Sequence, residues 1–346
     1  MVTFKIITLA AAVNEKKVDL LKDTFYDSGA VNVAGARIRC WKHGGHGAQT
    51  FLEVVENSCN PGFVNLGQLL GKENLFSYID RFGFGKKTGI DLNGEANGIL
   101  FSLNKVGPVE LATTAFGQGV SVTPIQQIAA VSSIINGGTL YKPYIVKSFL
   151  EPETGEIIKE VKPQIVKENL ISKETSEMVR YALESVVANG TGRPAYIEGY
   201  RVGGKTGTAQ KVNNGVYMVG NYIVSFIGFL PADDPEIVLY VAIDNPKGVT
   251  QYGGTVAGPV AKNILVDAAS ILNIQKRSDG MEKEYQWFDL KYYEVPNVIG
   301  LSKKEASSLL KNFQIEYTGV GDKVISQSPE SGEKILEQSK VRILLG

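Results

Sequence analysis

A chain of 346 residues is long enough for two domains, or for one large domain and one small one. Basic and acidic residues both number 36, so a formal charge of zero removes the electrostatic argument for binding nucleic acid or an anionic membrane surface. Two cysteines are too few for a disulfide scaffold, and no apolar stretch reaches the length of about 18 residues that a membrane span requires.

The opening MVTFKIITLAAAV places a lysine inside an apolar start and admits three interpretations. The first is a secretory signal, although the apolar run is short and no small-residue cleavage site follows cleanly. The second is a core helix over residues 1–22, because Ile6, Ile7 and Ala10 recur at helical spacing. The third is that TFK closes a catalytic motif whose first residue should stand at position 2.

Two helices are predicted further along the chain by their capping residues. A polar, glycine-rich region runs through Trp41, and a helix then begins at Thr50, which forms a capping box with Glu53. Thr123 begins a second helix over 123–138, which is closed by two glycines. Between them, GFGKKTGIDLNGEANG is turn-rich and predicts a loop over 83–98.

The last third of the first domain predicts an antiparallel sheet with a helix beside it. NYIVSFIGFL (221–230) and EIVLYVAIDN (236–245) are strand-like and are joined by the short turn PADDP, which favours a hairpin. Residues 254–272 have helical spacing. We therefore expect an α+β domain in which helices flank an antiparallel sheet.

The character of the sequence changes near residue 273. Residues 273–294 are polar without clear periodicity and predict a linker, and residues 295–346 predict a small folded unit. Ser302 and Glu305 form a capping box there, with Leu301 and Ala306 at the positions of a hydrophobic staple. Three strand candidates follow, with a turn at PESG. About 50 residues is small but can fold alone.

Three short stretches carry the functional signal: TFK at residues 3–5, SCN at 58–60 and KTGT at 205–208. Each is weak alone, and KTG also occurs at 87–89, inside the predicted loop, where we interpret it as structural. That copy half-resembles a phosphate-binding loop, but Asp80 stands where the motif requires its first glycine. The order of the three stretches matches S-x-x-K, S-D-N and K-T-G, the signature of penicillin-interacting serine enzymes.

The chain resembles the transpeptidase domain of class B penicillin-binding proteins over residues 1–272. FGQGVSVTPIQQIAAVSSIINGG, RVGGKTGTAQ and GGHGAQTFLEVVENSCN are similar to stretches of that family, and residues 295–346 resemble one PASTA domain. The resemblance implies a penicillin-binding fold that lacks its N-terminal part, a membrane-anchored protein at the extracytoplasmic face, and no required cofactor. It also implies peptidoglycan stem peptides and β-lactams as partners, together with other wall-synthesis proteins, in cell-wall or spore-cortex synthesis.

The resemblance assigns position 2 to the nucleophile of the first motif. The family reads S-T-F-K where this chain reads V-T-F-K, so Val2 stands in the place of the serine and Lys5 matches the lysine. Positions i and i+3 share a helix face, which lets such a lysine take the serine proton. Valine offers no nucleophile, so the chain as written should not be acylated. Either the chain is a fragment with altered first residues, or it is a natural pseudo-enzyme.

The second motif and the lysine of the third supply proton transfer and charge, as the resemblance implies. Ser58 is expected within hydrogen-bond reach of both Lys5 and Lys205, and would relay protons to the leaving group. Asn60 would hold the substrate amide and steady Lys5. Lys205 would supply positive charge near the site.

The resemblance also implies that the rest of the third motif would bind the substrate along a strand edge. The hydroxyls of Thr206 and Thr208 would bind the substrate carboxylate, and Gly207 leaves room for the substrate to lie like an added strand. The N–H groups of Thr208 and of residue 2 would form the oxyanion hole.

The expected reaction is acyl transfer on D-Ala–D-Ala stem peptides. A non-catalytic wall-binding scaffold is the alternative, and position 2 discriminates between the two. A β-lactamase or antibiotic sensor of the same fold is a third class, but no evident deacylating carboxylate supports it.

All cysteines and histidines of the chain fall in one window, with the spacing C-x2-H-x2-H-x12-C. Cys40, His43, His46 and Cys59 are therefore candidate ligands of a structural zinc ion. A disulfide between Cys40 and Cys59 is the other hypothesis, since an extracytoplasmic setting is oxidising. Free thiols are a third, and GGHG also allows His46 to be a structural turn residue. Zinc or a disulfide would each stiffen the loop that carries Ser58.

Overall fold

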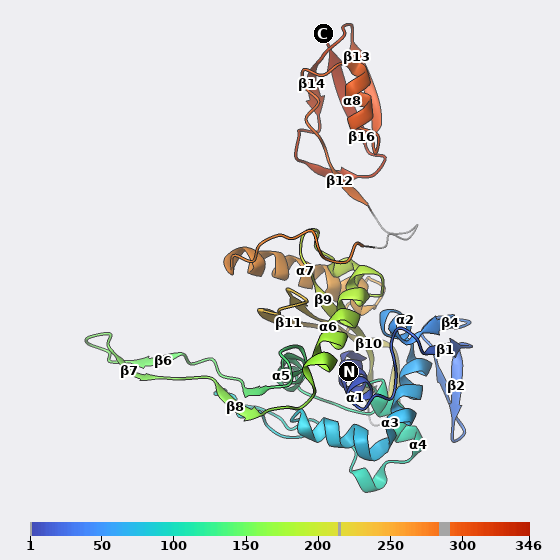
Figure 1. Ribbon diagram of the computed structural model, residues 1–346, viewed down its shortest axis with the longest axis vertical. Helices are drawn as coiled ribbons and strands as arrows, with labels where there is room; N and C mark the ends of the chain where they lie inside the picture. Colours follow the sequence, from blue (N-terminus) through green and yellow to red (C-terminus); the bar gives the residue numbers. More distant parts are fainter. Residues whose placement is uncertain (1, 214–215, 284–290) are drawn as a thin grey trace. The chain divides into compact units, whose positions relative to one another are not determined.

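The computed structural model describes residues 2–213, 216–283 and 291–346, and it divides into two compact units, Met1–Lys283 and Glu284–Gly346. Figure 1 shows the elements of both units, which are described separately below. The predicted linker over 273–294 lies partly outside the described residues. Of its described part, Arg277 donates its N–H to the carbonyl of Gly199 (2.7 Å), so this stretch packs on the first unit.

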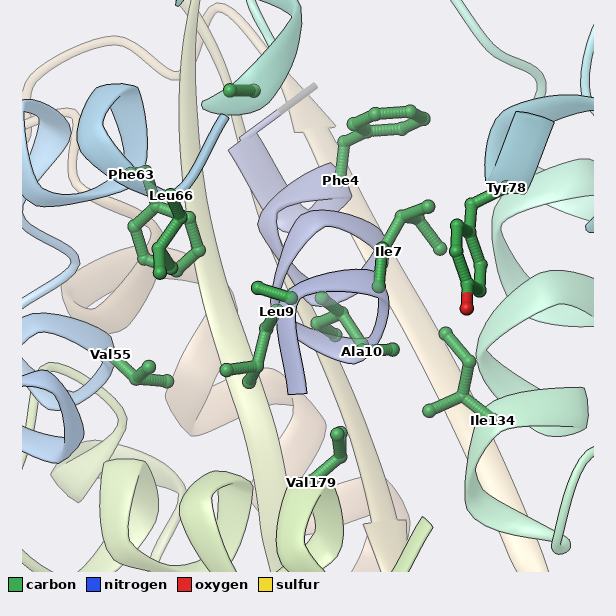
Figure 2. Packing of buried hydrophobic residues seen from close by; sticks show 14 of the residues in the cluster. Phe4, Ile7, Leu9, Ala10, Val55, Phe63, Leu66, Tyr78, Ile134 and Val179 are labelled. Atoms are coloured by element: carbon green, nitrogen blue, oxygen red, sulfur yellow. The ribbon is translucent and has the colours of Figure 1, made fainter. Parts of the chain in front are cut away.

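The opening segment is a buried core helix. A 3-10 turn over Val2–Phe4 (η1) leads into α1 (Lys5–Asn14). Phe4, Ile7, Leu9 and Ala10 lie among apolar side chains of the helices around α1, as Figure 2 shows, and all four are fully shielded from solvent. The core-helix interpretation is thus confirmed.

The predicted length of this helix was wrong, because α1 ends at Asn14 rather than at residue 22. Lys16 adopts a left-handed conformation with φ 51°, which stops the helix. Asp19 then accepts backbone N–H groups from Leu21 and Lys22, so its carboxylate stabilises a turn instead of a helix.

The polar, glycine-rich region after α1 contains four short strands. β1 (Thr24–Asp27) pairs antiparallel with β4 (Gly47–Thr50), and β2 (Ala30–Val33) pairs antiparallel with β3 (Ala36–Arg39). β4 leads directly into α2, whose predicted capping box between Thr50 and Glu53 is confirmed.

The helices of the first unit pack around α1 and on the sheet described below. The predicted capping box of Thr123 with Gln126 is present at the start of α5, and residues 83–98 contain no helix or strand, as expected. The bounds of the remaining helical elements are α2 (Phe51–Glu56), α3 (Asn60–Arg81), η2 (Leu103–Lys105), α4 (Pro108–Ala115), α5 (Pro124–Ile135), α6 (Lys173–Ala188), η3 (Arg193–Ala195) and α7 (Gly253–Ile271).

The main sheet has the strand order β11-β10-β9 and is antiparallel throughout. It consists of β9 (Gly203–Asn213), β10 (Val216–Leu230) and β11 (Ile237–Asp244), so the predicted hairpin is confirmed. Alternate side chains of β10 serve different layers: Ile227 and Phe229 join the core around α1, whereas Phe226 and Leu230 join the core under α7. The outcome is a mixed α/β domain with β9 at one edge of the sheet.

A β-ribbon projects from the body of the first unit between α5 and α6 (Figure 1). Its base is the antiparallel pair β5 (Leu140–Lys142) and β8 (Gln164–Lys167). Its outer part is the pair β6 (Ser148–Leu150) and β7 (Ile157–Glu160).

Among the described residues of the second unit, nine buried side chains form a separate core, to which Ala306 belongs and against which Leu301 packs. α8 (Lys303–Leu309) begins with the predicted capping box of Ser302 and Glu305. More strands are present than the three predicted, and the first of them falls at the end of the predicted linker: β12 (Tyr292–Glu294), β13 (Gln314–Gly319), β14 (Val324–Ser328), β15 (Lys334–Leu336) and β16 (Lys340–Leu345). β16 lies between β13, with which it is parallel, and β14.

Candidate functional site

The first and second motifs meet at the ammonium group of Lys5. Lys5 is the first residue of α1, and its side chain is fully buried. Its Nζ donates to Ser58 Oγ (3.1 Å), the Ser58 carbonyl (2.8 Å) and Asn60 Oδ1 (2.8 Å). Burial lowers the pKa of Lys5 to about 7, while the electrostatic interaction with the Cys59–Cys40 pair partly opposes the shift. A lysine with this pKa can act as a proton acceptor near neutral pH.

The SCN stretch forms the turn between α2 and α3. Ser58 has a left-handed backbone with φ 53°, Cys59 is the N-cap of α3, and Asn60 is its first residue. Asn60 is also held from outside the helix, since its Nδ2 donates to the carbonyl of Arg39 (3.2 Å). The turn therefore directs the side chains of Ser58 and Asn60 to the same lysine.

The third motif lies on β9, the edge strand of the main sheet, and β9 packs against η1. Gly207 comes close to the opening segment, because a Cβ built on it would lie 3.1 Å from the backbone nitrogen of Thr3. Lys205 is fully buried, and burial, followed by the charge of Lys5, lowers its pKa well below the usual value. The three motifs thus gather around one place, as the sequence predicted.

One predicted contact is wrong in the structure. Lys205 Nζ donates to the carbonyl of Thr206 (3.3 Å), and no hydrogen bond joins it to Ser58 in the described part of the chain. Lys5 already donates to the hydroxyl of Ser58, and burial together with the charge of Lys5 disfavours an ammonium group at Lys205.

The hydroxyls of the third motif are fixed by neighbouring segments. Thr206 Oγ1 lies 2.9 Å from Thr191 Oγ1, and Thr208 Oγ1 accepts the N–H of Gly253 at the start of α7 (3.0 Å). Thr191 and Gly253 are contacts that sequence reasoning missed, because nothing in the spacing of the chain connects them to KTG.

Val2 lies in η1, one helical turn before Lys5, and is 8% exposed. Its position beside both Lys5 and the β9 edge is where the resemblance places a serine. The other KTG copy is elsewhere: Thr88 and Gly89 donate to the carboxylate of Glu95, which closes their loop on itself. This supports the structural interpretation of residues 87–89.

The expected cysteine–histidine cluster exists, with one change of membership. Asp27, Cys40, His46 and Cys59 each offer a ligand atom, and these atoms all lie within 4.8 Å of one another. His43 is exposed and takes no part, so its prediction as a ligand was wrong. Sequence reasoning missed Asp27 because the pairing of β1 with β4, rather than local spacing, brings it to His46.

The carboxylate of Asp27 is the centre of this cluster. Its Oδ2 lies 2.9 Å from His46 Nδ1 and accepts from Cys59 Sγ (3.3 Å), and Cys40 Sγ lies 3.4 Å from His46 Nδ1. Both cysteines are buried, and neither takes part in a disulfide. Although burial opposes it, hydrogen bonds from Cys40 and His46 lower the pKa of Asp27 to about 2.

The two sulfurs of the cluster differ in charge state. A hydrogen bond from Cys59 lowers the pKa of Cys40 to about 5, and the same bond, together with burial, raises the pKa of Cys59. A carboxylate, an imidazole and two sulfurs, one of them a thiolate at neutral pH, form a donor set that suits tetrahedral zinc.

The chain was compared with known families, curated proteins and solved structures. The family model described as "Penicillin binding protein transpeptidase domain" matches residues 3–266, and that of the "PASTA domain" matches residues 293–346. "Stage V sporulation protein D" of Bacillus subtilis is 62% identical over 99% of this chain and 53% of its own length. "Penicillin-binding protein PbpB" of Mycolicibacterium smegmatis is 32% identical over 75% of this chain and 41% of its own length.

Solved structures agree with these relatives. Penicillin binding protein 3 from Mycobacterium tuberculosis, complexed with aztreonam, has a TM-score of 0.73 and 28% identity, covering 82% of this chain and 65% of that chain. The chain spans about half the length of the curated relatives it matches. No helix among the described residues is both long and apolar enough to cross a membrane.

Proposed function

We propose that the site formed by the three motifs is that of a peptidoglycan D,D-transpeptidase, since this chain belongs to the penicillin-binding protein transpeptidase family and carries a PASTA domain. The substrate class is a stem peptide that ends in D-Ala–D-Ala, and β-lactams are expected to occupy the same site. The identity with a protein named for stage V sporulation supports a role in spore-wall synthesis at the extracytoplasmic face.

One observation carries the proposal: Lys5 Nζ is hydrogen-bonded to both Ser58 and Asn60, while the segment before Lys5 packs against the KTG edge of β9. A serine oxygen at position 2 would lie between a neutral lysine and a strand edge able to hold an extended peptide.

The reaction is an acyl transfer in two steps. A serine Oγ at position 2 attacks the carbonyl carbon of the penultimate D-alanine, its proton passes to Lys5, and the bond to the terminal D-alanine breaks as a proton is delivered through Ser58 to the leaving amine. The amine of a neighbouring stem peptide then attacks the acyl-enzyme and releases the serine. Thr206 and Thr208 would bind the terminal carboxylate, whose negative charge would favour the protonated form of Lys205 despite the burial of that side chain.

Val2 cannot perform the first step, so the chain as written is expected to bind without being acylated. The test is labelling by a fluorescent penicillin of the protein as it is and of the variant Val2→Ser, with Val2→Ala as the matched control. Covalent label on Val2→Ser alone supports the proposal. A folded Val2→Ser protein that stays unlabelled, or label on Val2→Ala, would contradict it.

A non-catalytic wall-binding protein is the second candidate, and Val2 in place of a nucleophile is the observation that favours it. In that case the site retains affinity for stem peptides without turnover. Calorimetry with a D-Ala–D-Ala peptide distinguishes the two candidates. The wall-binding function predicts saturable binding that Val2→Ser leaves unchanged, and it predicts that neither protein releases D-alanine.

We further propose that the cluster holds a structural zinc ion through Asp27, Cys40, His46 and Cys59. The four donor atoms are close enough to share one ion, and the low pKa of Cys40 favours binding near neutral pH. Because Cys59 lies between Ser58 and Asn60, the ion would fix the turn that holds Lys5.

Metal analysis of protein purified without chelators or metal tags tests this proposal. His46→Ala is expected to lose one equivalent of zinc, whereas the matched control His43→Ala retains it. A metal-free protein with intact thiols, or one with a disulfide between Cys40 and Cys59 by mass spectrometry of alkylated peptides, would overturn the zinc assignment.

A further inference from the structure

The outer part of the projecting ribbon consists of β6 and β7 (Figure 1), and it carries large apolar side chains that are exposed to solvent. Phe149 and Leu150 of β6 are 50% and 53% exposed, and Ile157 and Ile158 of β7 are each 63% exposed. In the described part of the chain, β6 and β7 form a sheet of two strands only. An apolar ribbon with open edges is a template for pairing with another strand.

The free edge of β6 is regular, whereas that of β7 is not. The pairing of Phe149 with Lys159 and of Leu150 with Ile157 leaves Ile158 without an opposite residue, so β7 carries a bulge. Bulges disturb the spacing of hydrogen-bonding groups along an edge, and β6 is therefore the edge that a further strand can use.

Hydrogen bonds define which groups of β6 remain available. The carbonyl of Lys147 accepts from Val161 (2.9 Å) and the N–H of Glu151 donates to Glu156 (2.8 Å), so the backbone groups of residues 147, 149 and 151 face β7. Those of Ser148 and Leu150 consequently point to the open edge.

The available stretch is bounded at both ends. The carboxylate of Asp91 accepts the N–H groups of Ile145 and Val146 (2.8 Å each), and Pro152 has no N–H to donate. A partner strand on this edge is thereby confined to Lys147–Glu151, the sequence KSFLE.

We propose that this edge pairs with the same edge of a second copy of the chain, antiparallel and with the two-fold axis at Phe149. Ser148 of one copy and Leu150 of the other then exchange both backbone hydrogen bonds. Lys147 faces Glu151 of the second copy on each side of the axis, and the two Phe149 rings face each other. Opposite charges and paired aromatic rings at facing positions both favour an antiparallel pair.

The neighbouring registers are excluded by the same groups. Centring the axis on Ser148 requires the N–H of Val146, which Asp91 already holds, and it places Lys147 opposite Phe149. Centring it on Leu150 requires an N–H from Pro152. The charge pattern and the available donors thus select one register.

Sedimentation equilibrium of the full chain tests the proposal. A concentration-dependent dimer is expected, and Lys147→Glu and Glu151→Lys are each expected to weaken it roughly tenfold, because two opposite-charge pairs become like-charge pairs. The double variant Lys147→Glu/Glu151→Lys restores the dimer, and an equimolar mixture of the two single variants forms a heterodimer. Lys304→Glu, an exposed charge reversal in the second unit, is the matched control and leaves association unchanged.

Cross-linking tests the register itself. Facing residues of a non-hydrogen-bonded antiparallel pair have Cα atoms about 4.5 Å apart, within the range for a disulfide. Phe149→Cys should therefore form a covalent dimer on mild oxidation, whereas Glu151→Cys should not, since its copies lie four residues apart. Any of three results would overturn the proposal. The chain could stay monomeric at all concentrations, the dimer could be unaffected by Lys147→Glu, or the double variant could fail to restore the dimer.

Discussion

Restoring a serine at position 2 should give an acylation rate that follows the ionisation of Lys5. The Lys5 ammonium is fully buried, and burial is the main cause that lowers its pKa from 10.5 to about 7. At pH 7, a lysine of pKa 10.5 would be neutral in only about 0.03% of molecules, whereas at a pKa of about 7 roughly half are neutral. The fold therefore raises the supply of the basic form on the order of a thousandfold.

The assay is the second-order rate of labelling of Val2→Ser by a fluorescent penicillin between pH 5 and pH 9. Below the pKa the rate should rise about tenfold per pH unit, because only neutral Lys5 can take the serine proton, and it should level off above about pH 8. The midpoint is expected near pH 7. Val2→Ala reports any labelling that does not involve position 2.

Two results would refute this reasoning. A rate that still rises about tenfold per pH unit up to pH 9 would mean that burial does not lower the pKa of Lys5 to about 7 in the folded protein. A rate that does not change between pH 5 and pH 9 would mean that another group accepts the proton. Lys5→Met in the Val2→Ser background separates these cases, since it should abolish labelling if Lys5 is the base.

Three further predictions concern stability. Because the folded pKa of Lys5 lies below its unfolded value of 10.5, the unfolded state binds more protons between about pH 7 and 10.5. The free energy of unfolding, measured in urea and compared with that of Lys5→Met, should therefore rise by about 1.4 kcal/mol per pH unit over this range. A difference that does not change with pH would contradict this. Gly207→Ala should lower stability by about 1–3 kcal/mol, because its Cβ would lie 2.5 Å from Ser225 Oγ and 3.1 Å from the nitrogen of Thr3; Gly258→Ala in α7, with its nearest contact at 3.4 Å, should not be destabilising in the same thermal melts. Thr123→Ala removes the cap of α5 and should cost about 1 kcal/mol, to be compared with Thr123→Ser, which keeps the hydroxyl and should stay close to the parent.

Features of the fold that depend on neighbouring residues were predictable from the sequence. The capping boxes at Thr50, Thr123 and Ser302 lie within four residues of chain, and each is present. The hairpin of β10 and β11 is joined by a short turn, and it is also as predicted. In these cases the physical cause of the structure is contained in the segment itself.

Features that depend on distant segments were not predictable in this way. β1 and β4 are four residues each, and they pair with each other although the β2–β3 hairpin lies between them in the sequence. No local sequence pattern predicts these two strands. The same pairing brings Asp27 to His46, which is why the cluster was predicted with His43 instead. The meeting of Lys5 with Ser58 followed only from a resemblance, since 53 residues separate them.

The turn over residues 58–60 connects the two chemical centres of the first unit. Ser58 and Asn60 both accept from Lys5, while Cys59 between them donates to Asp27 on the other side. Successive side chains of one tight turn cannot move independently, so any change in the bonding of Cys59 must shift the two groups that hold Lys5. The left-handed backbone of Ser58 leaves little freedom to absorb such a shift. The state of the sulfur cluster and the position of the lysine are therefore coupled through three consecutive residues.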